Sequence, residues 1–218
     1  MIRILLVDDH DLVREGLIQI IKTTTDVVVT GEAADGQTAM NLLRKQPFDI
    51  VLLDLALPDQ SGLHWLKVIK GEQSTMPVLI LTMYGEQQYA VRCMRAGAAG
   101  YLTKRHASSE LMTAIRRVAS GQKYITSTVG AELATALERH ASASVALDIL
   151  SDRELEVLIL LTDGHSVSDI AEHLMLSIKT VSTYRTRLLQ KLHMTSNAEL
   201  IRYAITEGIT TQLPVKMA

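Results

Sequence analysis

The 218-residue chain has a single cysteine, few aromatic residues and no long apolar run. Because one cysteine cannot form a disulfide within the chain, the sequence is typical of a reducing compartment. Its apolar start, residues 1–7, is short and lacks a small-residue cleavage site, which argues against a signal peptide. No apolar stretch approaches the roughly 20 residues that a membrane-spanning helix needs. We therefore expect a cytoplasmic protein without a membrane partner.

Net charge is also low, at −2, but the charges are unevenly distributed along the chain. Residues 148–172 are mainly acidic. Residues 173–198 contain no Asp or Glu and carry four basic side chains: Lys179, Arg185, Arg187 and Lys191. Such local clustering says more about nucleic-acid binding than the overall isoelectric point does.

Short apolar runs alternate with helical patterns in the first half of the chain. The runs at 2–7, 27–33, 49–54, 77–82 and 100–104 predict β-strands, and several are nearly continuous in Val, Ile and Leu. That composition is typical of parallel strands covered on both faces. Alternating β and α units predict an α/β doubly wound, five-stranded parallel sheet of the flavodoxin-like kind.

The second half has no comparable strand and predicts an all-α domain of four helices. Capping-box sequences, SDRE at 151–154 and SNAE at 196–199, each precede an apolar run. Two further helices are expected between them, at about 167–174 and 178–192.

This pattern divides the chain into three predicted parts. Residues 1–120 form the α/β domain, and residues 151–218 form the helical domain. Residues 121–150 are expected to be a linker that includes a helix over 127–141.

Chemically active side chains follow the predicted strands. Asp8 and Asp9 follow the first strand, Asp54 ends the third, Thr82 ends the fourth and Lys104 ends the fifth. Because ligands of an open parallel sheet gather at the carboxyl ends of its strands, we expect these side chains to converge. Three clustered carboxylates repel one another unless a cation lies among them, and oxygen ligands suit Mg²⁺. The set favours phosphoryl transfer onto Asp54.

Each of these residues alone also has an ordinary structural explanation. An Asp after a strand is often a cap or turn residue. Thr82 is a normal strand residue, and Lys104 is a normal surface charge. The joint placement on four strand ends is what favours a shared site. The seven histidines, by contrast, are scattered without metal-ligand spacing, so none is expected to bind a metal.

Four motifs in order, LLVDDH, LLDLALPDQSG, LILT and AGAAGYLTK, resemble the receiver domain of bacterial two-component response regulators. The resemblance implies that Asp54 is the phosphoacceptor. It also implies that Asp9, Asp54 and the backbone carbonyl of Ala56 bind Mg²⁺ directly, while Asp8 acts mainly through water.

The same resemblance implies a switch formed by Thr82 and Tyr101. The hydroxyl would turn to the phosphoryl group and the aromatic ring would follow inward. The chain departs from many receivers in having Arg105 where proline commonly follows the lysine, which leaves the local loop geometry open. Met83 is also bulkier than the residue in many relatives.

Residues 166–192 have the layout of a helix-turn-helix, and residues 150–192 resemble the LuxR-type DNA-binding domain. A receiver joined to this domain is typical of the NarL/FixJ class of response regulators. The resemblance implies base contacts by Ser182, Thr183 and Thr186. It implies phosphate contacts by Lys179, Thr180, Arg187 and Lys191. Tyr184 departs from the histidine that is frequent at its position.

The helix at 197–207 resembles the dimerising helix of the family, with contacts by Leu200, Ile201 and Ala204, although core packing explains the same pattern.

The leading hypothesis is a non-enzymatic transcription regulator. A partner histidine kinase would phosphorylate Asp54, which would favour a homodimer and sequence-specific binding to double-stranded DNA; RNA polymerase is a further candidate partner. An aspartate-nucleophile phosphatase of the haloacid dehalogenase type is a weak alternative. It needs a second Asp where this chain has Ala56. A constitutive DNA-binding protein with a vestigial receiver is the third hypothesis.

Overall fold

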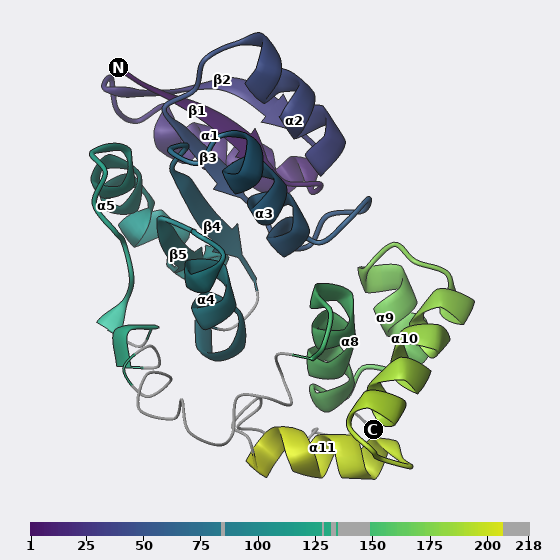
Figure 1. Cartoon of the computed structure of the whole chain (residues 1–218). Helices are drawn as coiled ribbons and strands as arrows, with labels where there is room; N and C mark the ends of the chain where they lie inside the picture. The colour runs from purple at the N-terminus through teal and green to yellow at the C-terminus, as the bar shows by residue number, and fades with distance from the viewer. Residues whose placement is uncertain (84–85, 128, 132–133, 135–148, 207–218) are drawn as a thin grey trace. The chain divides into compact units, whose positions relative to one another are not determined.

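The computed structural model describes residues 1–83, 86–127, 129–131, 134 and 149–206 (Figure 1). The chain divides into two compact units, residues 1–133 and 134–218, and each is described by itself. Most of the helix predicted over 127–141, and most of the predicted linker beyond it, lie outside the described residues. Among the described helices, none combines the length and apolar character that crossing a membrane requires.

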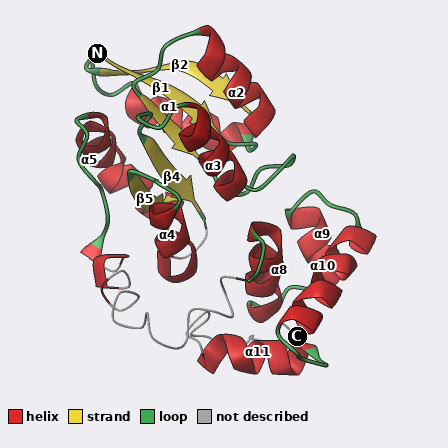
Figure 2. Ribbon diagram, in the orientation of Figure 1, coloured by secondary structure: helices red, strands yellow, loops and turns green. Residues whose placement is uncertain are grey.

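The first unit is built on a parallel sheet of five strands (Figure 2). The strands are β1 (Ile2–Val7), β2 (Val27–Ala33), β3 (Ile50–Leu53), β4 (Val78–Thr82) and β5 (Gly100–Thr103). Their order is β2-β1-β3-β4-β5, with every neighbouring pair parallel. This confirms the predicted fold class. The strand order reverses between β1 and β3, which is where ligands bind in sheets of this kind.

Helices cover both faces of the sheet, which explains the nearly continuous apolar strands. Helices α1 (Asp11–Ile21) and α5 (Ala107–Ala119) pack on one face, where Ile4, Leu6 and Leu81 are among the buried strand residues. Helices α2 (Gly36–Lys45), α3 (Gly62–Glu72) and α4 (Glu86–Arg95) lie on the other face (Figure 1). All of β3 is completely buried, as a central strand with two covered faces must be.

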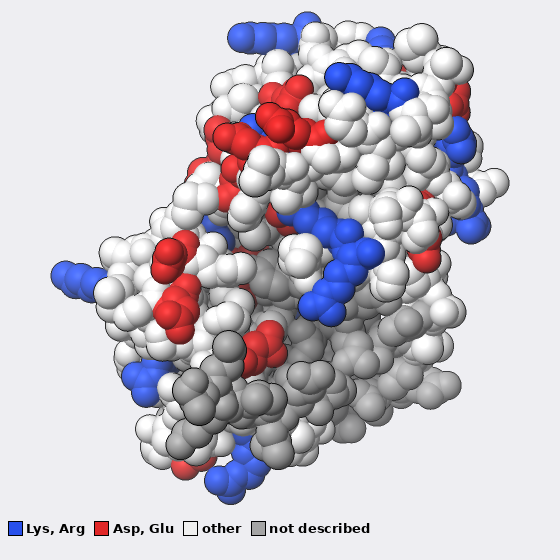
Figure 3. All heavy atoms as spheres, turned by 180° about the vertical axis from the view of Figure 1, so that it is seen from behind, with Lys and Arg blue, Asp and Glu red and all other residues white. Residues whose placement is uncertain are grey.

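Exposed ion pairs stand at the ends and edges of these elements. Arg3 bonds the carboxylate of Asp49, Arg116 bonds Asp26, and Arg44 bonds Glu72. The pairing with Arg3 lowers the pKa of Asp49 to about 2. Figure 3, seen from behind, shows acidic and basic side chains distributed over the surface in several small groups.

The second unit contains α8 (Asp152–Thr162), α9 (Val167–His173), α10 (Ile178–Lys191) and α11 (Asn197–Thr206). Helix α8 packs against all three of the others, and α9 also packs against α10. The turn between α9 and α10 is tight, and Met175 adopts a positive φ of 50° there. In the described part of this unit, residues 149–206, the predicted all-α architecture of four helices is confirmed.

Capping differs in detail from what the sequence predicts. The predicted box of Ser151 and Glu154 is present at the start of α8. At α11, Ser196 Oγ accepts a bond from the backbone of Glu199, but the Glu199 carboxylate accepts from Thr195 N instead of Ser196 N. The second predicted capping box is therefore only half formed.

Gly62 sits where α3 approaches the end of β3, and it generates a first prediction. A Cβ on Gly62 would lie 2.0 Å from the carbonyl oxygen of Asp54 and 2.7 Å from Leu55 Cα. We predict that Gly62→Ala lowers the free energy of unfolding by about 1–3 kcal/mol, because backbone has to shift. Gly71→Ala, in the same helix, meets nothing within 4 Å and should be neutral or stabilising by up to about 1 kcal/mol. Urea unfolding of both variants checks this, and equal stabilities would contradict it.

Candidate phosphoacceptor and metal site

Topology brings the predicted side chains to one edge of the sheet. Asp8 and Asp9 directly follow β1, Asp54 directly follows β3 and Thr82 is the last residue of β4. Lys104 begins a short 3₁₀ turn after β5. The strands are parallel, so their carboxyl ends meet at this edge. The convergence expected from the sequence is therefore present in the structure.

The buried ammonium of Lys104 joins two carboxylates from different strands. Lys104 Nζ lies 2.6 Å from Asp8 Oδ2 and 2.6 Å from Asp54 Oδ2. All three side chains are at least nine-tenths buried. Asp8, for which the family resemblance implies contact with a metal through water, thus contacts the lysine directly in this structure.

Burial and neighbouring charge set the protonation behaviour of these groups. Burial raises the pKa of Asp54 above its ordinary value; the charge of Lys104 opposes this and that of Asp8 reinforces it. A hydrogen bond with Thr82 also favours the ionised form of Asp54. Burial alone would lower the pKa of Lys104, but the charges of Asp54 and Asp8 outweigh burial and raise that pKa.

Backbone groups complete the surroundings of the Asp54 carboxylate. Its Oδ1 accepts a bond of 2.6 Å from Leu55 N. Ala56, whose carbonyl is the predicted third metal ligand, follows at once and is half-buried. Thr82 and Tyr101 are both buried, so the aromatic ring is already inside the domain in this structure.

The donor set fits a divalent cation. Asp8, Asp9, His10 and Asp54 each offer one ligand atom, and these atoms lie within 4.8 Å of one another. Three ionised carboxylates with one ammonium leave two negative charges uncompensated, which a divalent cation would neutralise. The buried Asp9 Oδ1 accepts no hydrogen bond, so one oxygen remains available. Sequence reasoning missed His10, because it searched for metal-ligand spacing among histidines alone.

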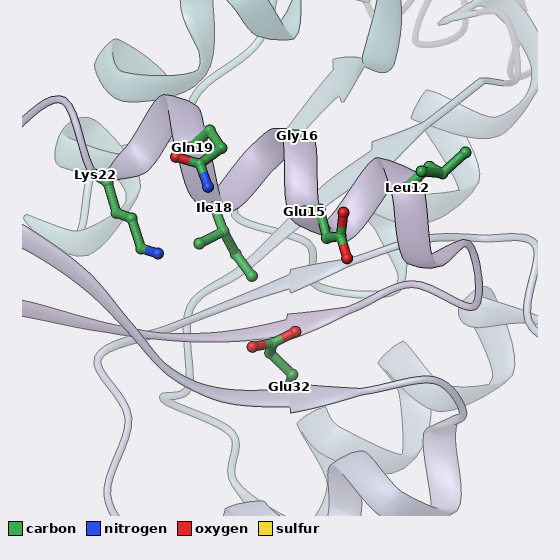
Figure 4. A pocket seen from close by; sticks show the side chains of 7 residues that line it. All are labelled: Leu12, Glu15, Gly16, Ile18, Gln19, Lys22 and Glu32. Atoms are coloured by element: carbon green, nitrogen blue, oxygen red, sulfur yellow. The ribbon is translucent and has the colours of Figure 1, made fainter.

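A separate hollow lies between α1 and β2 (Figure 4). Its volume is about 610 Å³, and Glu15 and Glu32 face one another across it. The hollow contains none of the predicted site residues, and its lining comes from Leu12, Glu15, Gly16, Ile18, Gln19, Lys22 and Glu32. It therefore adds nothing to the chemistry at the sheet edge.

Helix α10 carries the predicted DNA contacts. Ser177 Oγ caps it by accepting from Thr180 N, and Val181 and Leu188 anchor it in the domain core. The predicted base-reading and phosphate residues are exposed or half-buried: Lys179, Thr180, Ser182, Thr183, Thr186, Arg187 and Lys191. Ile178, which sequence reasoning did not single out, is 57% exposed at the start of the same helix.

Lys191 differs from the other basic residues of α10 because its ammonium forms an ion pair within the domain. Its Nζ lies 2.7 Å from Glu154 Oε2 and 3.0 Å from the carbonyl oxygen of Ile149. Burial opposes ionisation of Glu154, but the bonds from Lys191 and Ser151 outweigh it and lower the pKa of Glu154.

The residues of α11 with predicted dimer contacts differ in their exposure. Leu200 and Ala204 are both 0% exposed, in a helix that packs against α8. Both therefore pack in the core of their own domain, and their role in a dimer stays a prediction. Ile201 is half-buried, and Ile205, one residue beyond Ala204, is 39% exposed.

Comparisons with known proteins agree with both halves of the structure. Residues 4–116 match the family described as response regulator receiver domain, and residues 148–204 match bacterial regulatory proteins of the luxR family. Response regulator UvrY of Escherichia coli (strain K12) is 38% identical over 96% of both chains. Response regulator GacA of Pseudomonas aeruginosa is 36% identical, over 96% of this chain and 98% of its own. A solved structure of RcsB from Salmonella enterica serovar Typhimurium, bound to a promoter with the phosphomimetic BeF₃⁻, has a TM-score of 0.62 and 25% identity. It covers 94% of this chain and 98% of its own.

The lysine bridge generates a second prediction. In Lys104→Gln, Asp8 and Asp54 lose their shared cation, so the free energy of unfolding in a metal chelator should fall by about 2 kcal/mol or more. Adding Mg²⁺ should recover part of this loss, because an ion that binds the folded state stabilises it. Arg105→Gln removes the exposed neighbouring charge and should change stability by less than about 0.5 kcal/mol. Urea unfolding with and without Mg²⁺ makes the comparison, and a Lys104→Gln protein as stable as Arg105→Gln would refute the prediction.

Proposed function

The chain belongs to the response regulators that join a receiver domain to a LuxR-type DNA-binding domain, and we propose that phosphorylation of Asp54 controls its binding to DNA. The observation that carries the proposal is the bridge from Lys104 to Asp8 and Asp54 at the carboxyl edge of the sheet. The bridge supports the proposal because a positive charge lies beside the buried carboxylate of Asp54, which is the proposed nucleophile.

In the proposed reaction, an oxygen of Asp54 attacks the phosphorus of a phosphohistidine on a partner kinase. The phosphorus–oxygen bond forms, the phosphorus–nitrogen bond breaks and the kinase imidazole leaves. Lys104 is already within hydrogen-bond reach of Asp54 Oδ2, so its ammonium can pair with a phosphoryl oxygen bound there. Asp9, Asp54 and the Ala56 carbonyl would hold Mg²⁺, with Asp8 acting through water. The bound ion would supply charge neutralisation for the phosphoryl oxygens.

The buried pair of Thr82 and Tyr101 is the proposed switch. Thr82 already bonds the Asp54 carboxyl group, so a phosphoryl group on Asp54 would compete for its hydroxyl. A move of Thr82 would change the packing around Tyr101 in the neighbouring strand. A local change of charge at Asp54 can in this way change the packing of the side chains around β4 and β5.

The proposed partners follow from the two domains. Phosphorylation would favour a homodimer, whose two α10 helices would suit two half-sites of double-stranded DNA. Ile201 is half-buried and Ile205 is exposed, so these two isoleucines of α11 are available for a dimer contact. RNA polymerase is a further proposed partner, and a regulator that binds DNA would act in the cytoplasm.

The phosphoacceptor assignment gives the third prediction. With Mg²⁺ and acetyl phosphate, the wild-type protein should gain the mass of one phosphoryl group and bind its target DNA more tightly. Asp54→Ala should gain neither property. Asp11→Asn, which removes an exposed carboxylate two residues beyond Asp9, should behave like the wild type.

Intact mass and titration of genomic DNA fragments at one fixed salt concentration provide the measurements. A protein that binds DNA equally with and without the phosphoryl group would support the constitutive hypothesis and exclude the switch.

The difference between Arg187 and Lys191 gives the fourth prediction. Arg187 is exposed and takes part in none of the ion pairs found among the described residues, so Arg187→Ala should weaken binding to all DNA sequences alike. It should also reduce the slope of log affinity against log salt by about 1. Lys191→Ala should leave that slope nearly unchanged and lower stability, because the buried carboxylate of Glu154 loses its partner. Salt titrations and urea unfolding of both variants test this, and equal slopes for the two would contradict it.

A further inference from the structure

We propose that His10 is a nitrogen ligand of the acidic site, so that the site binds first-row transition ions such as Zn²⁺ and Mn²⁺ in preference to Mg²⁺. The inference rests on the proposed function, because the ion at this site would then determine whether Asp54 can receive a phosphoryl group. Its starting observation is that His10 belongs to the same 4.8 Å cluster of ligand atoms as Asp8, Asp9 and Asp54.

The hydrogen bonds of the cluster show which oxygens are already used. Asp8 Oδ2 and Asp54 Oδ2 accept the ammonium of Lys104. Asp8 Oδ1 accepts a bond of 3.0 Å from the backbone N–H of His10, and Asp54 Oδ1 accepts from Leu55 N. Each of these four oxygens therefore has a partner within the protein.

Asp9 Oδ1 is the exception. It is buried and accepts no hydrogen bond, and the side chain of Asp9 is only 7% exposed. His10 Nδ1 lies 2.6 Å from this oxygen, but the contact lacks the alignment of a hydrogen bond. A buried carboxylate oxygen without a donor is costly to maintain, and a shared cation would satisfy the oxygen and the nitrogen together.

The position of His10 makes it suitable as a ligand that meets an ion from solvent. Its side chain is 56% exposed, whereas that of Asp8 is 2% exposed. As the N-cap residue of α1, His10 has an extended backbone and no side-chain capping bond, so its ring is not needed for the helix. The ring can therefore adjust to an ion held by the carboxylates beneath it.

Ligand chemistry determines which ions benefit from His10. Oxygen ligands alone suit Mg²⁺, which keeps several waters and gains little from an imidazole. A mixed set of oxygen and nitrogen ligands raises affinity for Mn²⁺ and, more strongly, for Zn²⁺. A coordination position of the ion that His10 fills is no longer open to a phosphoryl oxygen of the phosphodonor. We therefore expect Zn²⁺ to slow phosphorylation of Asp54.

The test compares metal affinities of the full-length protein at one fixed pH. Zn²⁺, Mn²⁺ and Mg²⁺ are titrated separately into the wild type, His10→Ala, His10→Gln and the control His64→Ala. His64 is an exposed histidine of α3. We expect both His10 variants to bind Zn²⁺ at least about tenfold more weakly and Mg²⁺ within about twofold of the wild type, with His64→Ala unchanged.

Pulsed electron paramagnetic resonance of bound Mn²⁺ tests the ligand directly. The wild type should show coupling of the metal to an imidazole nitrogen, and His10→Ala should lose that coupling. Unchanged Zn²⁺ affinity in both His10 variants, or nitrogen coupling that persists without His10, would overturn the inference.

Failure of the proposed function would look different. In Mg²⁺ alone, the wild type and His64→Ala should each gain one phosphoryl group from acetyl phosphate, because His64 lies outside the acidic cluster. If neither the wild type nor His64→Ala is phosphorylated in Mg²⁺, the role proposed for Asp54 is wrong, while the Zn²⁺ and Mn²⁺ measurements still decide the role of His10.

Discussion

The buried ammonium of Lys104 is the interaction on which the candidate site depends. It lies 2.6 Å from carboxylates that follow β1 and β3, and Lys104 itself follows β5. One side chain thereby ties together three strand ends in a low-dielectric setting, where unpaired charges are expensive. The backbone of Asp54 is also closely packed, because a Cβ on Gly62 at the start of α3 would lie 2.0 Å from its carbonyl oxygen.

Most of the fold and the convergence of the site could be predicted from the sequence. Strands covered on both faces need continuous apolar residues, so β1 and β4 are evident from composition, and parallel pairing then brings their carboxyl ends to one edge. Strand limits were less accurate: residues 49–54 predicted one strand, but β3 is Ile50–Leu53. Asp49 instead accepts bonds from the backbone and side chain of Arg3, a contact between distant residues that no local pattern contains.

The sequence did not predict which helix side chains contact their own domain and which remain free to contact a partner. The apolar pattern of α11 suits a core and a dimer equally, and packing against α8 assigns Leu200 and Ala204 to the core. The same limit applies to Lys191, whose place in a basic segment conceals its bond to Glu154 from the start of α8. His10 was missed for a third reason. Its nearness to three carboxylates comes from the turn between β1 and α1, and not from a spacing of histidines.

The two ways of compensating the carboxylates also connect the site to the proposed switch. Lys104 and a divalent cation bound by the carboxylates would neutralise Asp8, Asp9 and Asp54 together. A phosphoryl group on Asp54 adds negative charge and new acceptor oxygens, so Lys104 and the hydroxyl of Thr82 would both gain a stronger partner than they have now. Because Thr82 and Tyr101 are buried, neither can follow that attraction without repacking its neighbours. The close packing that makes the site rigid is therefore also what would carry a change at Asp54 into the rest of the domain.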